Sequence, residues 1–261
     1  MNCRTPRNSH PSALIEPLEQ RSLLSASPQL LVSFYGLGGA GGFGNDWLDN
    51  IADKAGDATH STVKKYDEDQ GGRALKDTLH AIDRNHDRII SSSEAKATTL
   101  RVLGYSFGGI QAANFAQYFR KVGHTIKGYT LKAAVQIKAL VTLDPVQSVI
   151  KHTSGVPSNV LKFSNYYQQK GGDTKVSLYT DPLNIKVTSI SVPDPSNIKG
   201  GSLKTSARTS SQVRVDVAPY AEESVKHKVQ SHVNGKIKGK DVNHGTLPFY
   251  AYDWAVEDLT A

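Results

Sequence analysis

The sequence has almost no cysteine: Cys3 is the single one among 261 residues. One thiol excludes an internal disulfide and a cysteine-based metal site. Long apolar runs are also missing, since no stretch approaches the roughly 20 apolar residues that a membrane-spanning helix needs. We therefore predict no membrane span. A secreted protein without disulfides needs another stabilising element, for which a bound metal ion is one candidate.

Acidic residues are fewer than basic ones, 24 against 31, which gives a formal net charge of +7. Much of the excess lies in residues 226–240, which hold two short lysine clusters. Such a segment is either a solvated loop or a contact for an anionic cell-surface polymer. Nucleic acid is not a predicted partner, because no aromatic residues are interleaved with these lysines and no binding motif is present.

Residues 1–27 differ in composition from the rest of the chain. They have a basic start and small residues, but a shorter apolar stretch than a secretory signal requires. Leu18–Ser25 reads L-E-Q-R-S-L-L-S and resembles the bacterial N-terminal motif L-E-P-R-x-L-L-S, with Gln20 in place of proline. The resemblance implies an export segment and a secreted or cell-surface protein of a bacterium. The alternative is a disordered tail.

Residues 28–261 are predicted to form one α/β domain. With 38% hydrophobic residues the chain can bury a core. Short apolar runs that read as strands alternate with amphipathic stretches that read as helices, which predicts a mostly parallel sheet with helices on both faces. The strands are expected at 30–35, 61–66, 100–103, 139–143 and 160–163, and the helices at 47–55, 74–82, 107–121 and 249–259. The first helix has Asn45 or Asp46 as N-cap. Residues 170–240 are predicted to be an irregular cap or loop, apart from a strand at 213–217.

The segment Gly104–Gly108 contains G-x-S-x-G between a predicted strand and a predicted helix. In a nucleophile elbow, this strand-to-helix turn exposes the serine hydroxyl above the sheet, and small residues relieve the crowding of the turn. Ser106 is therefore the predicted nucleophile. The alternative is an ordinary turn serine.

A nucleophilic serine needs a base and an orienting carboxylate, which follow it here in the order Ser, acid, His. His244 is the predicted base, because it directly precedes the predicted C-terminal helix; His227 and His232 lie among lysines and are expected to be solvated. Asp144 is the predicted acid, because it ends the strand after the nucleophile helix, at the sheet edge where such folds place their sites. The competing acids are Asp173, Asp181 and Asp216.

Acyl transfer also needs N–H donors for the developing oxyanion. We expect one from the backbone of Phe107 and one from the glycine-rich turn after the first strand, at Leu37 or Gly38. These pieces resemble the α/β-hydrolase superfamily, and Leu143–Pro145 (L-D-P) is similar to the motif around the acid of pancreatic-type lipases. The resemblance covers most of residues 30–261. It implies hydrolysis of a small-molecule or lipid-like acyl ester through a covalent acyl-enzyme.

The same glycine turn also matches a dinucleotide fingerprint. Gly36–Gly41 fits G-x-G-x-x-G, and Asp67 ends the second strand, where an acid that binds ribose could lie. The fingerprint should open directly into a helix, so that pyrophosphate meets its N-terminus. Here Gly42–Asn45 lengthens the turn. A Rossmann-like dinucleotide-binding protein is an alternative reading.

Residues 83–94 match one 12-residue EF-hand loop. Oxygen ligands fall at the expected positions, with a backbone carbonyl at the seventh: Asp83, Asn85, Asp87, Ile89 (carbonyl), Ser91 and Glu94. Arg88 stands where glycine is usual, so its backbone is expected to be strained. The loop resembles EF-hand and dockerin-type loops, which implies Ca²⁺ as a structural cofactor. The alternatives are a polar surface loop and a non-enzymatic calcium-binding surface protein on a hydrolase scaffold.

Overall fold

Six parallel strands form the central sheet, in the order β11-β8-β7-β4-β1-β2. The computed structural model describes residues 27–42, 44–145, 156–167, 175–180, 185–191, 211–216 and 247–261. The strands of the sheet are β1 (Gln29–Phe34), β2 (Thr62–Tyr66), β4 (Thr99–Tyr105), β7 (Ile137–Leu143), β8 (Val160–Tyr167) and β11 (Ser211–Asp216). The predicted α/β class is confirmed.

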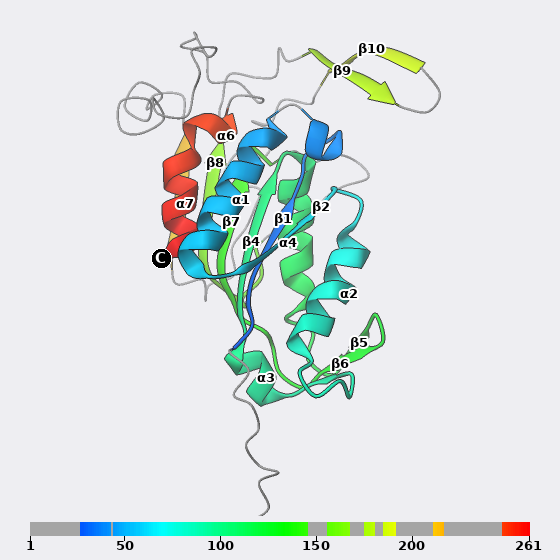
Figure 1. The fold of residues 1–261 in the computed structure, drawn as a ribbon, viewed down its shortest axis with the longest axis vertical. Helices are drawn as coiled ribbons and strands as arrows, with labels where there is room; N and C mark the ends of the chain where they lie inside the picture. Colours follow the sequence, from blue (N-terminus) through cyan, green and yellow to red (C-terminus); the bar gives the residue numbers. More distant parts are fainter. Residues whose placement is uncertain are drawn as a thin grey trace, which may run out of the picture.

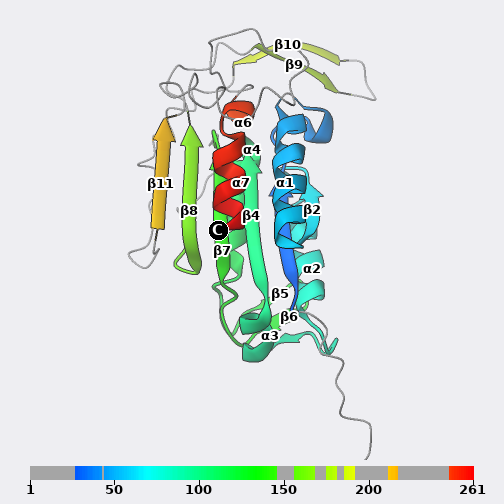
Figure 2. The same ribbon diagram turned by 60° about the vertical axis from the view of Figure 1, so that its left-hand side comes forward.

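Helices cover both faces of this sheet (Figures 1 and 2). One face carries α1 (Asn45–Thr59), α6 (Leu247–Tyr250) and α7 (Tyr252–Thr260), and the other carries α2 (Gly71–Ile82) and α4 (Phe107–Tyr118). The short helices are η2 (Gly39–Gly41), after β1, and α3 (Ser92–Ala97), before β4. None of the helices in the described ranges is long and apolar enough to cross a membrane.

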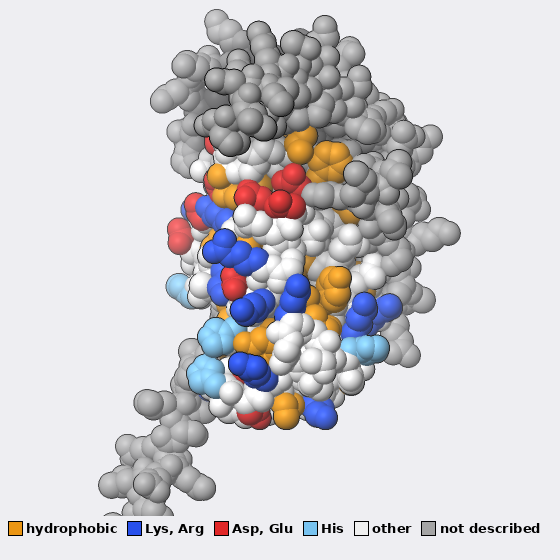
Figure 3. Space-filling model, turned by 90° about the vertical axis from the view of Figure 1, so that its right-hand side faces the viewer, with side chains coloured by type: hydrophobic (Ala, Val, Ile, Leu, Met, Phe, Trp, Pro, Cys, Tyr) orange, Lys and Arg blue, Asp and Glu red, His pale blue; other side chains and the backbone are white. Residues whose placement is uncertain are grey.

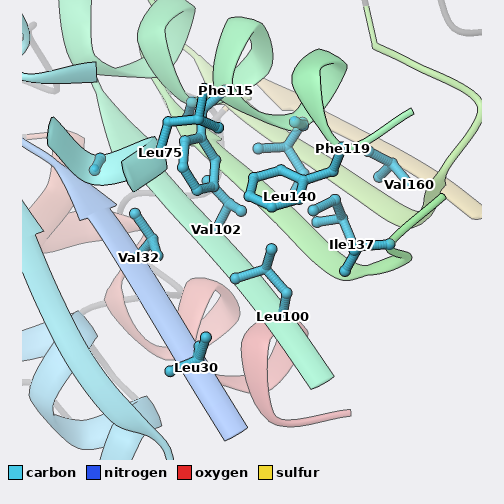
Figure 4. Close-up of a cluster of buried hydrophobic side chains, with 14 of the residues drawn as sticks. Leu30, Val32, Leu75, Leu100, Val102, Phe115, Phe119, Ile137, Leu140 and Val160 are labelled. Carbon is cyan, nitrogen blue, oxygen red and sulfur yellow. The ribbon is translucent and has the colours of Figure 1, made fainter. Parts of the chain in front are cut away.

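The core is divided in two by the sheet, because successive side chains of a strand point to opposite faces. In β4, Val102 belongs to the cluster beneath α2 and α4, whereas Leu103 belongs to the cluster beneath α1 and α7. Figure 4 shows side chains of the first cluster, among them Leu75, Phe115 and Leu140. Burial on both faces explains why the inner strands appear in the sequence as short, mostly apolar runs without a strict alternation of apolar and polar residues.

The C-terminal segment folds as two helices instead of the one predicted, with Ala251 between them. The Trp47 ring of α1 meets the Phe249 ring of α6 edge-on, with 4.8 Å between centroids. In α7, the Trp254 ring stacks on Tyr166 of β8 at 6.0 Å. The segment is thereby packed against both α1 and the sheet.

Polar contacts also hold α7. Asp258 accepts a hydrogen bond from the Tyr166 hydroxyl at 2.6 Å and pairs with Lys162 at 2.8 Å. At the next residue of the helix, the Leu259 carbonyl accepts a hydrogen bond from Nε of the buried Arg101 of β4 at 2.7 Å. These bonds connect the last helix to two strands of the sheet.

Two smaller sheets were not predicted. One joins β3 (Ile89–Ile90), β6 (Tyr129–Leu131) and β5 (Thr125–Ile126), and the other pairs β9 (Lys175–Thr180) with β10 (Ile185–Ser191). β9 and β10 lie within residues 170–240, where no strand before 213–217 was predicted, and the strand expected at 213–217 is present as β11. On the face in Figure 3, charged side chains of both signs are interspersed with small apolar areas over the described part.

Candidate active site

The turn between β4 and α4 holds Ser106 in a strained backbone conformation. Its φ is 55° and its ψ is −127°, outside the regions that residues with a side chain normally adopt. The Ser106 N–H donates to the Leu143 carbonyl, and the Gly109 N–H donates to the Ser106 carbonyl, both at 3.0 Å. The strand and helix predicted on either side of Ser106 are present, and these bonds fix the turn to β7 and to the first turn of α4.

Glycines around Ser106 let α4 approach the sheet closely. A Cβ on Gly108 would overlap the carbonyl oxygens of Phe34, the last residue of β1, and of Tyr35, which follows it. A Cβ on Gly104 would lie 2.8 Å from the Ala112 side chain. The start of α4 is therefore in backbone contact with the end of β1, a contact that a larger residue would prevent.

Asp144 occupies the end of the neighbouring strand. Tyr105 of β4 is paired with Leu143 of β7. Ser106 directly follows Tyr105 and Asp144 directly follows Leu143, so both residues lie at the carboxyl ends of these neighbouring strands. Asp144 is fully buried, has a φ of 40°, and its N–H donates to the Tyr166 carbonyl at 2.7 Å. Burial, and then the charge of Asp144, holds the pKa of Tyr105 well above its usual value. The Asp144 carboxylate thus acts electrostatically on the residue directly before the nucleophile.

The predicted base, His244, lies outside the described residues. So do His227, His232, Asp173 and Asp181, while Asp216 is the last residue of β11. The described chain resumes at Leu247 in α6, which packs against the first turn of α1 through Trp47 and Phe249. The first turn of α1 follows the carboxyl end of β1, so α6 lies near the sheet edge that carries Ser106 (Figures 1 and 2).

The predicted oxyanion donors lie on two segments that meet at Ser106. A Cβ added to Gly36 would be only 2.9 Å from the Cβ of Ser106, so the glycine turn starts directly beside the nucleophile. Leu37 is half-buried, and Gly38 is exposed with a φ of 93°. Phe107 directly follows Ser106 and is the first residue of α4.

Asn45 does not cap α1 as predicted. The helix begins at Asn45, and the cap position belongs to Gly44, which has a φ of 85°. The Asn45 side chain is turned toward the glycine turn instead, where Oδ1 accepts from the Gly36 N–H at 3.0 Å and Nδ2 donates to the Gly39 carbonyl. Sequence reasoning missed this contact, because a polar residue near a helix start is equally typical of a cap.

The glycine turn does not open directly into a helix. Gly36 and Asn45 are separated by the turn of η2, so the N-terminus of α1 does not follow the first glycines as in a dinucleotide site. Asp67 lies against Gly39, where a Cβ would be 2.5 Å from its Oδ1, and it accepts from Gln70 Nε2 at 3.0 Å. This geometry gives the dinucleotide alternative no support.

The predicted calcium loop has the backbone strain expected from its sequence. Arg88, at the position where glycine is usual, has a φ of 62°, and His86 has a φ of 59°. The Arg88 N–H donates across the loop to Asp83 Oδ2 at 3.0 Å. The Ile89 N–H donates to Asp87 Oδ1 at 2.7 Å. Residues 83–89 therefore form a closed turn held by its own carboxylates.

Strand β6 orients the carbonyl that is predicted to be a ligand. The Thr130 N–H donates to the Arg88 carbonyl and the Lys132 N–H to the Ile90 carbonyl, both at 2.9 Å. Carbonyls alternate in direction along a strand, so the Ile89 carbonyl points away from β6. The Ile89 carbonyl therefore points to the same side of β3 as the Ile89 N–H, which donates to Asp87 within the loop.

Glu94 closes the loop through a capping box with Ser91. Its carboxylate accepts from the Ser91 N–H at 2.9 Å, from the Ser91 hydroxyl at 2.7 Å and from the Arg84 N–H at 2.9 Å. Burial alone would raise the pKa of Glu94, but these hydrogen bonds outweigh it, and the pKa is lowered. The carboxylate is therefore negative at neutral pH.

The loop residues fit Ca²⁺ in kind and in order. Carboxylate, amide, hydroxyl and carbonyl oxygens are the ligands this ion prefers. Asp83 is buried, and its Oδ1 has no hydrogen-bond partner among the described residues. Within the described ranges, however, no three Asp, Glu, His or Cys side chains are gathered closely enough to hold a metal ion. Binding would need the side chains of the loop to turn inward.

No family model and no curated protein sequence matches the chain. Similar solved structures include a lipase/esterase from Lactobacillus plantarum (TM-score 0.41, 13% identity, 76% of this chain and 81% of that one). They also include an esterase from Pyrobaculum calidifontis (0.40, 13%, 90% and 75%) and a dienelactone hydrolase from Anabaena variabilis (0.38, 10%, 89% and 86%). At these values no residue role is transferred, and the function has to be derived from the geometry of this chain.

Proposed function

We propose that the protein is a serine hydrolase that cleaves a carboxylic ester or a related acyl bond. The observation that carries the proposal is the strained turn of Ser106 at the carboxyl edge of a parallel sheet. A strained non-glycine residue at such an edge is typical of a nucleophile elbow. The buried Asp144 on the next strand supplies a carboxylate at the same edge.

In the proposed mechanism, Ser106 Oγ attacks the acyl carbon while His244 accepts its proton and Asp144 orients the imidazole. The N–H groups of Phe107 and of Leu37 or Gly38 stabilise the oxyanion of the tetrahedral intermediate. The leaving alcohol takes the proton from the imidazolium, and an acyl-enzyme remains. Water, deprotonated by the same imidazole, then releases the acid and restores the serine.

Replacing His244 by alanine is expected to lower kcat by about 10⁴-fold, because the serine loses its general base. The measurement is hydrolysis of a series of p-nitrophenyl esters. His227→Ala and His232→Ala are the controls and should keep kcat within about twofold. Loss of turnover in one of these controls, with His244→Ala active, would assign the base elsewhere.

Calcium is the second part of the proposal, as a structural ion. Asp83, Asn85, Asp87, Ser91 and Glu94 would hold it with the carbonyl of Ile89. The loop joins α2 to α3, which leads into β4. An ion in the loop would fix the start of β4, whereas Ser106 follows the opposite end of this strand. The ion would therefore stabilise the fold without contacting the reacting atoms.

Adding Ca²⁺ to the metal-free protein is expected to raise its Tm by about 5–10 °C at roughly 100 times Kd, since a ligand of the folded state stabilises it by about 2.7 kcal/mol there. Asp83→Asn should remove most of this rise, because the buried carboxylate becomes a neutral amide. Asp57→Asn, an exposed position of α1, is the control and should keep it. Equal Tm values of the wild type in Ca²⁺ and in chelator would refute the site.

Location and surface contacts are proposals from sequence alone. The export motif at 18–25 supports a secreted or cell-surface protein, and the basic segment 226–240 supports contact with an anionic polymer. Both segments lie outside the described residues.

A further inference from the structure

The Asn45 side chain spans the two residues from which the second oxyanion donor is expected. Its Oδ1 accepts from the Gly36 N–H at 3.0 Å, and its Nδ2 donates to the Gly39 carbonyl. Leu37 and Gly38 lie between these two anchored residues. One side chain at the start of α1 thus fixes both ends of the turn.

This clamp is closely fitted. Asn45 is 0% exposed; its hydrogen bond with the Gly36 N–H is buried, and its bond with the Gly39 carbonyl is partly buried. Hydrogen bonds shielded from water hold their groups more firmly than exposed ones. A Cβ on Gly42 would lie 2.5 Å from Asn45 Nδ2 and 2.5 Å from the Leu37 carbonyl oxygen, whereas a Cβ on Gly41 would meet nothing within 4 Å. The clamp therefore requires a glycine at 42 and tolerates a side chain at 41.

Gly36 connects the clamp to the nucleophile, because it lies between Asn45 and the Ser106 side chain. We propose that Asn45 is a positioning residue that sets the N–H groups of Leu37 and Gly38 relative to Ser106. The proposal rests on the hydrolase function proposed above. A misplacement of catalytic groups by about 1 Å can cost about 10²-fold in rate, so a clamp on these donors should be visible in kcat.

Asn45→Ala is expected to lower kcat for a p-nitrophenyl ester by about 10- to 100-fold with KM changed less than about twofold, because oxyanion donors act in the transition state. Rates are divided by the concentration of active sites, which is measured by titrating Ser106 with a fluorophosphonate. A smaller folded fraction of the variant then does not lower the kcat that is obtained. Asn50→Ala, an exposed asparagine of the same helix, is the matched control and should behave as wild type.

A second pair of variants leaves Asn45 in place. Gly42→Ala should reproduce the loss in kcat by displacing the Asn45 amide and the Leu37 carbonyl, and Gly41→Ala should not. Comparison of these two variants tests the positioning role of Asn45 even if Asn45→Ala does not fold. Wild-type kcat in folded Asn45→Ala or Gly42→Ala, or a change in KM alone, would overturn the proposal.

Amide hydrogen exchange tests the clamp independently of activity. The Gly36 N–H should exchange at least about tenfold faster in Asn45→Ala or Gly42→Ala than in the wild type or in Gly41→Ala, because its acceptor is removed or displaced. If the wild type cleaves no ester, the hydrolase proposal fails, and unchanged exchange in the variants would then refute the clamp itself.

Discussion

Ser106→Ala is expected to abolish ester hydrolysis, with a loss of about 10⁴- to 10⁶-fold in kcat. The proposed reaction proceeds through a bond to Ser106 Oγ, an oxygen that alanine lacks. Covalent labelling by a fluorophosphonate, read as a mass increase on the intact chain, should disappear at the same time. Folding should be preserved, because the substitution removes one atom.

Ser92→Ala, an exposed serine at the start of α3, is the matched control and should keep both turnover and labelling. A folded wild type that is neither labelled nor active on esters would instead favour the calcium-binding surface protein on a hydrolase scaffold. Undiminished labelling of Ser106→Ala would place the nucleophile at another residue.

Gly108→Ala is expected to destabilise the fold by more than about 3 kcal/mol, a large part of the roughly 5–15 kcal/mol that a domain possesses. The added Cβ would overlap the carbonyl oxygens of Phe34, at the end of β1, and of Tyr35, which follows it. Backbone atoms of a strand that is paired on both sides cannot move aside as the end of a flexible side chain can. Thermal unfolding should show a Tm lower by about 6–12 °C, or no folded protein.

Gly72→Ala is the matched control, since Gly72 is the second residue of α2 as Gly108 is of α4. Its Cβ would meet only the end of the Lys127 side chain, with Nζ at 3.1 Å. Alanine favours a helix over glycine by about 0.5–1 kcal/mol, so this variant should be equally or more stable. A Gly108→Ala variant as stable as Gly72→Ala would show that α4 does not pack on β1 as described.

The sheet could be predicted from the sequence because its central strands are buried on both faces. The run expected at 100–103 is β4 (Thr99–Tyr105), and the run expected at 139–143 is β7 (Ile137–Leu143). Such strands are mostly apolar, with isolated polar residues such as Arg101 in β4, and Gly104 and Pro145 lie near the ends of the two runs. The backbone strain expected at Arg88, which occupies the position where glycine is usual in such loops, is also present, since Arg88 has a positive φ.

The small elements could not be predicted, because their strands are only two or three residues long. β3 and β6 have no periodic pattern, and they pair across some 40 residues of chain, with Ile89 opposite Thr130. The two bonds of Asn45 depend on how the glycine turn folds back, which the composition of the turn does not specify. His244 remains a prediction from chain order.

The packing of the C-terminal helices has an optical consequence. The chain has two tryptophans, and each lies where these helices dock: Trp47 against Phe249 and Trp254 against Tyr166. Both indoles are partly buried, so undocking would increase their exposure to water and shift their emission to the red. Intrinsic fluorescence therefore reports, without any label, whether the end of the chain is seated on the body of the protein.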